Sequence, residues 1–490
     1  MTEFDLARSD EMLGLPTAGP KAVRGGTIRT TSYLVSTLAV AVASIFLLRH
    51  LGVTDFGRYV TVMSLVAIVA ALSDAGLTMV GQREYVHLPT AAERRTLVAD
   101  VLGIRLLITP VGLLAAILFA LSAGYTDAMT LGTLLAGLGL VLANGAKTFT
   151  LPLTASLRLG SAAAVDLAQA LTGVVAMVVL IATGAGLLPF FAVHIVAGLA
   201  SLALALIVVG PALRVGPRTA WREWRPLLVA AAPLGLAIVV NMLYLRALVV
   251  LTSLLASGFE TGLFATSYRV LEITVGVSAV MVGAAFPILA HAGSRDERRL
   301  AYVLQRLLEV SMLVAGALVL VLAIGAQPLI DIIGGDAYHD AGPVLRIQAF
   351  ALLGAFAGGV WTAGLVGIKR QSALILTNAI ALVAALVLGG AFIPWLGAKG
   401  AAVAAVVGEA VLALAVLIML VRARPALRPS FGFAFRLAAA AALGAACVFI
   451  PGVPLLARAV LAAAVYSVVA FALGAVPAEV LDALRHRTQE

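Results

Sequence analysis

Long apolar runs separated by short polar connections are the feature of this sequence that most restricts how it can fold. A helix needs roughly 20 apolar residues to cross the hydrocarbon core of a membrane. Apolar residues make up 62% of the 490 positions and charged residues 12%, whereas a soluble domain carries about 25% charged residues. We therefore predict an all-α polytopic membrane protein with fourteen transmembrane helices. The runs are 28–50, 57–79, 100–122, 128–149, 160–183, 187–209, 226–255, 260–287, 301–325, 343–368, 371–393, 398–421, 432–450 and 455–474.

The same composition excludes several classes of protein. Because little chain lies outside the apolar runs and Cys447 is the single cysteine, a cytosolic enzyme, a nucleic-acid-binding protein and a disulfide scaffold are ruled out. The sequence contains no P-loop and no His-Glu-x-x-His pair, and its connections are too short to hold a catalytic domain. The acidic N-terminal tail, followed by a full-length apolar run, also differs from a cleaved signal peptide. We expect neither an enzyme nor a bound metal or cofactor.

The placement of basic residues predicts the orientation of the chain. If the N-terminus is cytoplasmic, 25 of the 33 Lys and Arg residues fall in tails and connections on the cytoplasmic side. Five fall on the other side, and three lie inside the apolar runs. An excess of Lys and Arg is typical of the cytoplasmic connections of membrane proteins. We therefore expect 1–27 and 477–490 to be cytoplasmic tails.

A short motif recurs in two halves of the chain. DFGRY (55–59) lies before the second run and ETGLF (260–264) lies before the eighth, and both fit the pattern acidic-x-Gly-x-aromatic. Six runs is an even number, so both halves enter from the same side and the pattern predicts two six-helix lobes related by a parallel pseudo-two-fold axis. The predicted parts are an N-lobe at 28–213, a cytoplasmic interfacial linker at 214–225, a C-lobe at 226–421 and two further helices at 422–476.

Four segments carry a resemblance to a known family. They are LLRHLGVTDFGRYVTVMSLVAIVAALSDAGL (47–77), SGFETGLFATSYRVLEI (257–273), QPLIDIIGGDAYHDAGPVLRI (327–347) and PWLGAKGAA (394–402). Together they resemble bacterial polysaccharide and O-antigen flippases, in the multidrug/oligosaccharidyl-lipid/polysaccharide exporter superfamily. The resemblance covers the first twelve predicted helices in order, and fourteen helices suit this branch.

This resemblance implies a transporter in the bacterial cytoplasmic (inner) membrane. It would move an undecaprenyl-pyrophosphate-linked oligosaccharide or polysaccharide precursor to the outer leaflet by alternating access between two helical lobes. The implied partners are this lipid-linked glycan, membrane lipids, and a glycan polymerase or glycosyltransferases, but no nucleic acid. Two alternatives stay open, namely a cation-coupled multidrug exporter of the same superfamily and a non-transporting membrane scaffold for cell-wall assembly.

Arginine inside an apolar run is the strongest indication of a functional site. Such a residue costs about 2.5–3.5 kcal/mol at the centre of a membrane helix, so we expect it to be paired or to face a wet cavity. Arg269 lies near the middle of the eighth run, with Glu272 one turn further on. Either the two neutralise each other, or Glu272 orients Arg269 toward a cavity where its guanidinium binds pyrophosphate. Arg246, in the seventh run, is a second candidate ligand, with snorkelling toward the membrane surface as its alternative.

Three arginines at the ends of the first two runs are further candidates for the same headgroup. Arg49 and Arg58 lie on the outer side, against the charge rule, and local pairing with Asp55 is the alternative. Arg29 begins the first run and could equally be a cytoplasmic anchor. All three are therefore predicted ligands that have a purely structural interpretation beside the functional one.

The predicted helices also contain carboxylates, at Asp74, Asp166, Glu309 and Glu409. A carboxylate at membrane depth is a candidate for coupling transport to H⁺ or Na⁺. Glu409, in the middle of its run with no basic neighbour in sequence, is the stronger candidate, whereas Asp74 could instead cap a helix or pair. Arg105, in the third run, is interpreted as structural, with Asp100 and Asp166 as possible partners.

Overall fold

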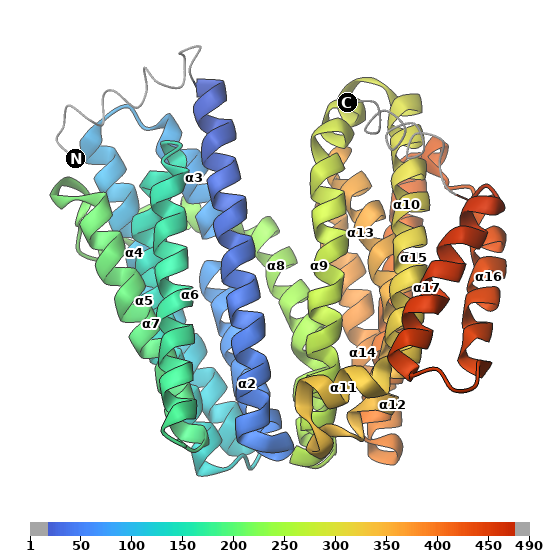
Figure 1. The fold of residues 1–490 in the computed structure, drawn as a ribbon. Helices are drawn as coiled ribbons and strands as arrows, with labels where there is room; N and C mark the ends of the chain where they lie inside the picture. The colour runs from blue at the N-terminus through green and yellow to red at the C-terminus, as the bar shows by residue number, and fades with distance from the viewer. Residues whose placement is uncertain (1–17, 476–490) are drawn as a thin grey trace. The chain divides into compact units, whose positions relative to one another are not determined.

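The computed structural model shows a chain of helices joined by short connections (Figure 1). It describes the backbone of residues 18–475, and the side chains of that range except those of 18–28, Thr30, Tyr33, Ala290 and 293–295. The helices are α2 (Ala18–Asp74), α3 (Leu77–His87), α4 (Ala91–Ser122), α5 (Asp127–Ala155), α6 (Leu159–Ala182), α7 (Leu187–Val209), α8 (Trp221–Leu255), α9 (Gly258–Arg295), α10 (Glu297–Ile324), α11 (Ala326–Gly334), α12 (Ala341–Gln348), α13 (Ala351–Gly367), α14 (Ala373–Leu396), α15 (Ala398–Ala423), α16 (Gly432–Ala445) and α17 (Leu455–Ala472). The predicted tails 1–27 and 477–490 lie outside the described residues, except for the first turns of α2.

Thirteen helices in the described range are long and apolar enough to cross a membrane. Because that range holds no strand, the predicted all-α polytopic class is confirmed, whereas the count of fourteen is not. The difference lies at the start, where Leu34–His87 is one apolar stretch of 54 residues that includes most of the first two predicted runs. Gly52 interrupts α2 there with non-helical angles, φ 73° and ψ 173°. A positive φ favours glycine, so one residue breaks the helix where the sequence suggests a longer connection.

The chain forms two compact units, one ending at Met242 and the other beginning at Leu243. This division falls inside α8, whereas the boundary expected from the sequence is the connection 214–225. Part of that connection docks on α4, since the backbone N–H of Arg218 donates to the carbonyl of Ala99 at 3.1 Å. The predicted lobe limits stay a prediction, and the two units are described separately below.

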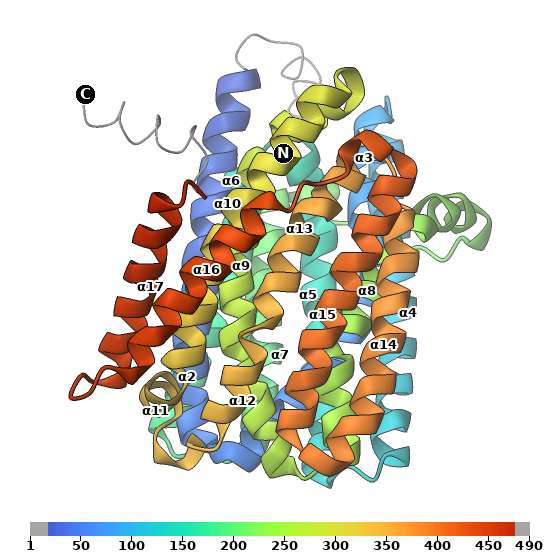
Figure 2. The same ribbon diagram turned by 90° about the vertical axis from the view of Figure 1, so that its right-hand side faces the viewer.

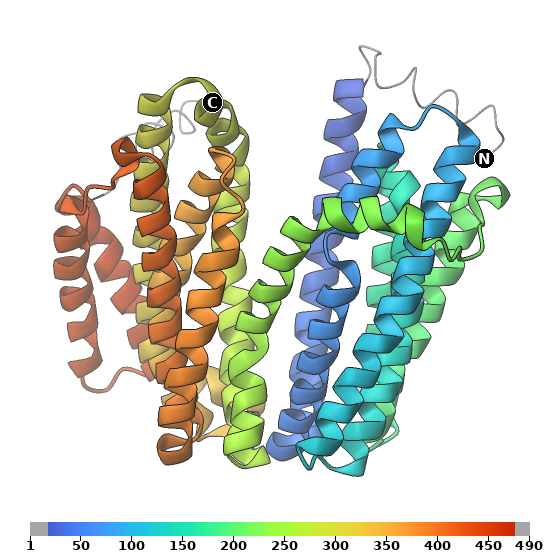
Figure 3. The same cartoon turned by 180° about the vertical axis from the view of Figure 1, so that it is seen from behind.

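In the N-terminal unit, α5 and α7 pack closely, and α2, α4 and α6 complete the bundle. Glycine permits this approach: a Cβ on Gly139 would lie 2.4 Å from the backbone of His194, and one on Gly198 would lie 2.7 Å from the carbonyl oxygen of Gly139. Small residues at an interface let membrane helices come this close. The start of α8 packs beside α3 and α4 (Figure 3), where Trp224 joins a buried cluster with Leu77.

In the C-terminal unit, α14 and α15 lie side by side, and α13 packs against α15 and α9 (Figure 2). The last two helices, α16 and α17, pack against each other and against α10. Tyr466 of α17 is buried at Gly316 of α10, where a Cβ would lie 2.4 Å from the tyrosine hydroxyl oxygen. Gly354 of α13 lies close to the backbone of Glu409 in α15, where a Cβ would be 2.7 Å away, so α13 and α15 pack tightly beside that carboxylate residue.

Candidate functional site

Two arginines and one glutamate form an ion-paired cluster in the C-terminal unit. Arg246 lies on α8, and Arg269 and Glu272 lie one turn apart on α9. Nη1 of Arg246 is 3.0 Å from Oε1 of Glu272, and Nη1 of Arg269 is 3.2 Å from Oε2. Each carboxylate oxygen therefore serves a different guanidinium. The pair expected between Arg269 and Glu272 is present, and Arg246 joins it from the neighbouring helix.

This cluster keeps a net positive charge and partial access to its surroundings. The side chains of Arg246, Arg269 and Glu272 are 23%, 34% and 27% exposed. Among the described residues, the buried Nε of each arginine has no hydrogen-bond partner. Guanidinium groups bind phosphate and carboxylate through parallel N–H donors. Two neighbouring guanidiniums that share one carboxylate therefore suit a phosphorylated ligand.

Two tyrosines hold the backbone around the cluster. The hydroxyl of Tyr268 donates to the backbone carbonyl of Leu245 at 3.0 Å, which ties α9 to α8. The hydroxyl of Tyr244 donates to Oε1 of Glu409 at 2.8 Å, which ties α8 to α15. Because these bonds fix the helices on both sides, the placement of the arginines does not depend on Glu272 alone.

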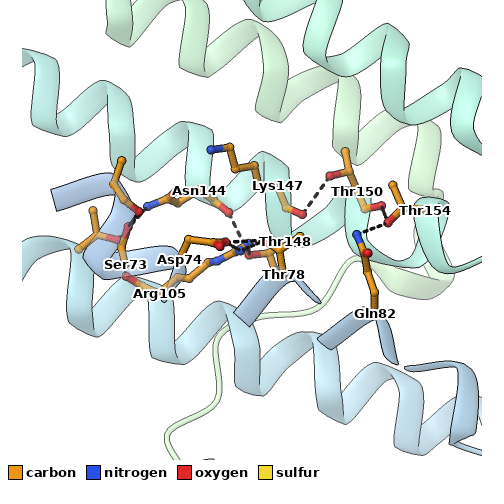
Figure 4. Close-up of polar contacts among 12 residues, drawn as sticks. Ser73, Asp74, Thr78, Gln82, Arg105, Asn144, Lys147, Thr148, Thr150 and Thr154 are labelled. Carbon is orange, nitrogen blue, oxygen red and sulfur yellow. Dashed lines mark hydrogen bonds and ion pairs between the residues drawn. The ribbon is translucent and has the colours of Figure 1, made fainter. Parts of the chain in front are cut away.

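Another arginine–carboxylate pair lies in the N-terminal unit and is of a different kind (Figure 4). The Arg105 side chain of α4 is 1% exposed, and its Nη2 is 2.6 Å from Oδ1 of Asp74 at the end of α2. The same guanidinium donates to the hydroxyls of Thr78 at 2.6 Å and Thr148 at 2.9 Å. Acceptors from α2, α3 and α5 thus surround this charge, which fits a structural role.

The partner of Arg105 is Asp74, and the prediction of Asp100 or Asp166 is wrong. Asp74 ends α2 directly before a turn whose next two residues have φ 34° and 78°. This left-handed turn closes the helix beside α4, so a carboxylate distant in sequence reaches the guanidinium. Asp74 is also a candidate coupling carboxylate, and the structure shows that it pairs with Arg105, which is the alternative role considered for it.

A third group of charges lies on α2, α5 and α6. Arg29, Lys147 and Asp166 are exposed, and the two cations lie within electrostatic range of Asp166. Figure 4 shows the ammonium of Lys147 standing apart from the Arg105 pair. The structure thus brings predicted ligand Arg29 and predicted coupling residue Asp166 together, and adds a lysine that the sequence did not single out.

Asp166 also lines a cavity of about 290 Å³ between α2, α6 and α7. Most of its lining is apolar, with Tyr59 and His194 among the polar exceptions. The Tyr59 hydroxyl lies 3.4 Å from Nε2 of His194. The cavity therefore combines a hydrophobic wall with a carboxylate at its edge.

The arginines at the ends of the first two predicted runs have different surroundings. Nη1 of Arg58 is 2.8 Å from Oδ1 of Asp55, so the local pair given as the alternative is present. Arg49 is exposed. Whether either residue binds a headgroup stays a prediction.

Comparison with known proteins assigns the chain to a family. Residues 22–293, which are more than half of the chain, match the family described as "Polysaccharide biosynthesis protein". The chain belongs to this polysaccharide biosynthesis family. A comparison with curated proteins gives no match.

Several solved transporters share the fold of this family member. "Lipid II flippase MurJ, inward closed conformation" aligns with a TM-score of 0.76 at 11% identity, over 90% of this chain and 98% of that one. An inward-facing multidrug resistance MATE family transporter of the MOP superfamily aligns with a TM-score of 0.63 at 14% identity, over 82% of this chain and 98% of that one. A MOP superfamily transporter from Pyrococcus furiosus aligns with a TM-score of 0.55 at 16% identity, over 84% of this chain and 95% of that one. At these identities the likeness shows the fold alone, and it is the family match that confirms the resemblance to polysaccharide biosynthesis proteins.

Sequence reasoning on this polysaccharide biosynthesis protein found the charged residues but missed the bonds between helices. The contact of Arg246 with Glu272 joins two separate helices, and the contact of Tyr244 with Glu409 joins two others. A signal for the tyrosines exists in the sequence, because Tyr268 directly precedes an intramembrane arginine and Tyr244 lies two residues before another. A tyrosine hydroxyl within an apolar helix needs a hydrogen-bond partner, which predicts bonds of the kind that Tyr244 and Tyr268 form.

Proposed function

We propose that this chain carries a polyprenyl-pyrophosphate-linked oligosaccharide, or another cell-surface polysaccharide precursor, across the bacterial cytoplasmic membrane by alternating access. The observation that carries the proposal is the sharing of Glu272 by Arg246 and Arg269. One carboxylate for two guanidiniums leaves a positive charge at a partly exposed place on otherwise apolar helices.

Charge at membrane depth supports an anionic ligand. Each arginine costs about 2.5–3.5 kcal/mol at a helix centre, and one glutamate offsets only part of the cost for two. Pyrophosphate offers oxygens on two phosphorus atoms, so it can accept hydrogen bonds from both guanidiniums at once. In this proposal the protein breaks no bond and is not an enzyme. Its work is to lower the free energy of moving a polar headgroup through hydrocarbon while the polyprenyl tail stays in lipid.

The comparisons support a lipid-linked substrate. The family is described by polysaccharide biosynthesis, and a structure with the same fold is named a lipid II flippase. Proposed partners are therefore the lipid-linked glycan, membrane lipids, and the glycan polymerase or glycosyltransferases that use or supply it. The excess of Lys and Arg on alternate connections supports cytoplasmic placement of both termini.

Coupling to H⁺ or Na⁺ is proposed at Glu409 first and at Asp166 second. Glu409 accepts a hydrogen bond from the neutral Tyr244, which leaves its charge uncompensated by that contact. Asp166 has the cation Lys147 within electrostatic range. Asp74 and Glu309 are the weaker of the four candidates, because Arg105 and Arg306 already pair with their carboxylates.

A cation-coupled multidrug exporter is the second candidate. The fold shared with a multidrug resistance MATE transporter favours it, as does the apolar cavity edged by Asp166. The two functions predict different phenotypes for a deletion strain. Loss of surface glycan with unchanged drug susceptibility supports the flippase, and drug sensitivity with normal surface glycan supports the exporter.

Arg269→Ala tests the flippase directly. Removing one guanidinium removes charge-assisted hydrogen bonds worth about 1.5–3 kcal/mol, so we expect glycan export to fall about tenfold or more at normal membrane abundance. Quantitative detection of surface glycan, with a membrane immunoblot of the protein, measures both. Arg306→Ala is the matched control, because Arg306 forms the same kind of i,i+3 pair with Glu309 on α10, at 2.7 Å. Normal surface glycan in the Arg269 variant contradicts the proposal.

A further inference from the structure

Glu272 occupies the position that an anionic ligand of the two arginines would take. Its oxygens lie 3.0 Å and 3.2 Å from Nη1 of Arg246 and Nη1 of Arg269. Glu272 takes Nη1 of each guanidinium, so a phosphate that binds either guanidinium through its paired N–H donors competes with Glu272 for that nitrogen. Substrate and Glu272 therefore cannot both have full use of the two Nη1 donors.

We propose that Glu272 is an internal counter-ion that competes with the pyrophosphate of the substrate for Arg246 and Arg269. The inference rests on the proposed function and extends it from binding to release. When the substrate arrives, its phosphate oxygens take the guanidinium donors and Glu272 moves aside. When the substrate leaves, the carboxylate returns, so release exchanges one ion pair for another instead of exposing two bare charges.

Competition of this kind lowers affinity in a calculable way. The apparent dissociation constant equals the intrinsic one divided by the fraction of protein whose site is open. If Glu272 leaves the arginines open in about one tenth of the molecules, its removal tightens binding about tenfold. Affinity changes within one site act mostly on the dissociation rate, so release slows by a similar factor.

The surroundings allow Glu272 to move while the arginines stay in place. Tyr268 ties α9 to the carbonyl of Leu245, and Tyr244 ties α8 to Glu409, independently of Glu272. The Glu272 side chain is 27% exposed, which gives it room to turn away.

Titration of the purified protein with inorganic pyrophosphate, in neutral detergent at one fixed salt concentration, tests the proposal by calorimetry. We expect Glu272→Gln to bind pyrophosphate about tenfold more tightly than the unaltered protein. In cells the same variant is expected to export less surface glycan, because tighter binding slows release. Such a split between affinity and export would not arise if Glu272 only oriented Arg269, since losing orientation weakens both.

A matched control and a second variant separate the possible outcomes. Glu309→Gln removes a carboxylate that pairs with Arg306 on α10, and it should leave pyrophosphate affinity unchanged. Arg269→Ala combined with Glu272→Gln should lose the tenfold gain. If Arg269→Ala weakens binding but Glu272→Gln does not tighten it, or if Glu309→Gln tightens it equally, the counter-ion role is overturned and the flippase stands. If pyrophosphate binds none of these proteins, the anion site of the proposed function fails together with the counter-ion.

Discussion

At the scale of single residues, the intramembrane arginines differ in how completely their surroundings enclose them. Arg105 donates to Asp74 and two threonines and is buried. Arg246 and Arg269 share one glutamate and stay partly exposed. The sequence identifies all three as arginines in apolar runs, but it cannot rank them, because the decisive partners come from other helices. Only the local pair of Arg269 with Glu272 could be predicted, since its spacing lies on a single helix.

Asp74→Asn is expected to destabilise the N-terminal unit. The substitution leaves the Arg105 guanidinium buried without its counter-charge, which costs about 3 kcal/mol when one member of a buried pair is removed. The melting temperature of the purified protein in detergent should fall clearly. Replacing Arg105 with Leu in the same protein should recover part of the loss, because the unpaired charge is then gone as well. An Asp74→Asn protein of unchanged stability with impaired export would instead assign Asp74 to ion coupling.

At the scale of helices, length and apolar composition predict most elements, whereas breaks inside them are harder to predict. The second predicted run, 57–79, extends past the turn after Asp74 that divides α2 from α3. The connection predicted before it reduces to Gly52, with φ 73°. Both breaks rest on one or two residues in the left-handed region. The sequence places the first break within 51–56, whereas the second predicted run continues across the other. Contacts between helices are also hard to predict from the sequence, because a glycine can lie at a helix–helix interface or in a turn.

Gly139→Ala is expected to loosen the contact of α5 with α7. A Cβ there would lie 2.4 Å from the His194 backbone, so the helices must separate, and overpacking of this kind costs about 1–3 kcal/mol. Gly173→Ala on α6 is the matched control, because its Cβ would meet the Cβ of Ala197 at an ordinary 3.7 Å. Thermal unfolding in detergent should separate the two variants. Equal melting temperatures would show that α5 and α7 adjust without loss.

At the scale of the whole molecule, the sequence predicts the fold class, the superfamily and an orientation in the membrane. The two copies of its repeated motif, however, make different local contacts. In the first motif, Asp55 pairs with Arg58 three residues later. In the second, Glu260 accepts a hydrogen bond from the backbone N–H of Ala398, at the start of α15, at 2.7 Å. The motif therefore occurs at corresponding places in the two halves, but its acidic residue forms an ion pair in the first half and accepts a backbone hydrogen bond in the second. Only three-dimensional packing reveals that difference.

The predicted orientation can be tested by single-cysteine labelling. Cys447 is buried and is replaced by serine to give a background without reactive thiols. Ala337→Cys, in the connection between α11 and α12, should react with a membrane-impermeant maleimide on intact cells. Thr219→Cys, in the basic connection before α8, should react only after the membrane is permeabilised, because connections rich in Lys and Arg stay in the cytoplasm. The reverse pattern would invert the assigned topology.

The glutamate shared by two arginines also bears on the return stroke of the proposed cycle. An unloaded carrier must reset with its site vacant, and unscreened charge in a low-dielectric interior raises the barrier to that step. With its own carboxylate between the guanidiniums, the vacant site presents one excess charge instead of two. The unloaded protein can therefore change conformation more easily. During transport to the outer leaflet, the phosphates of the substrate neutralise the positive charge that remains.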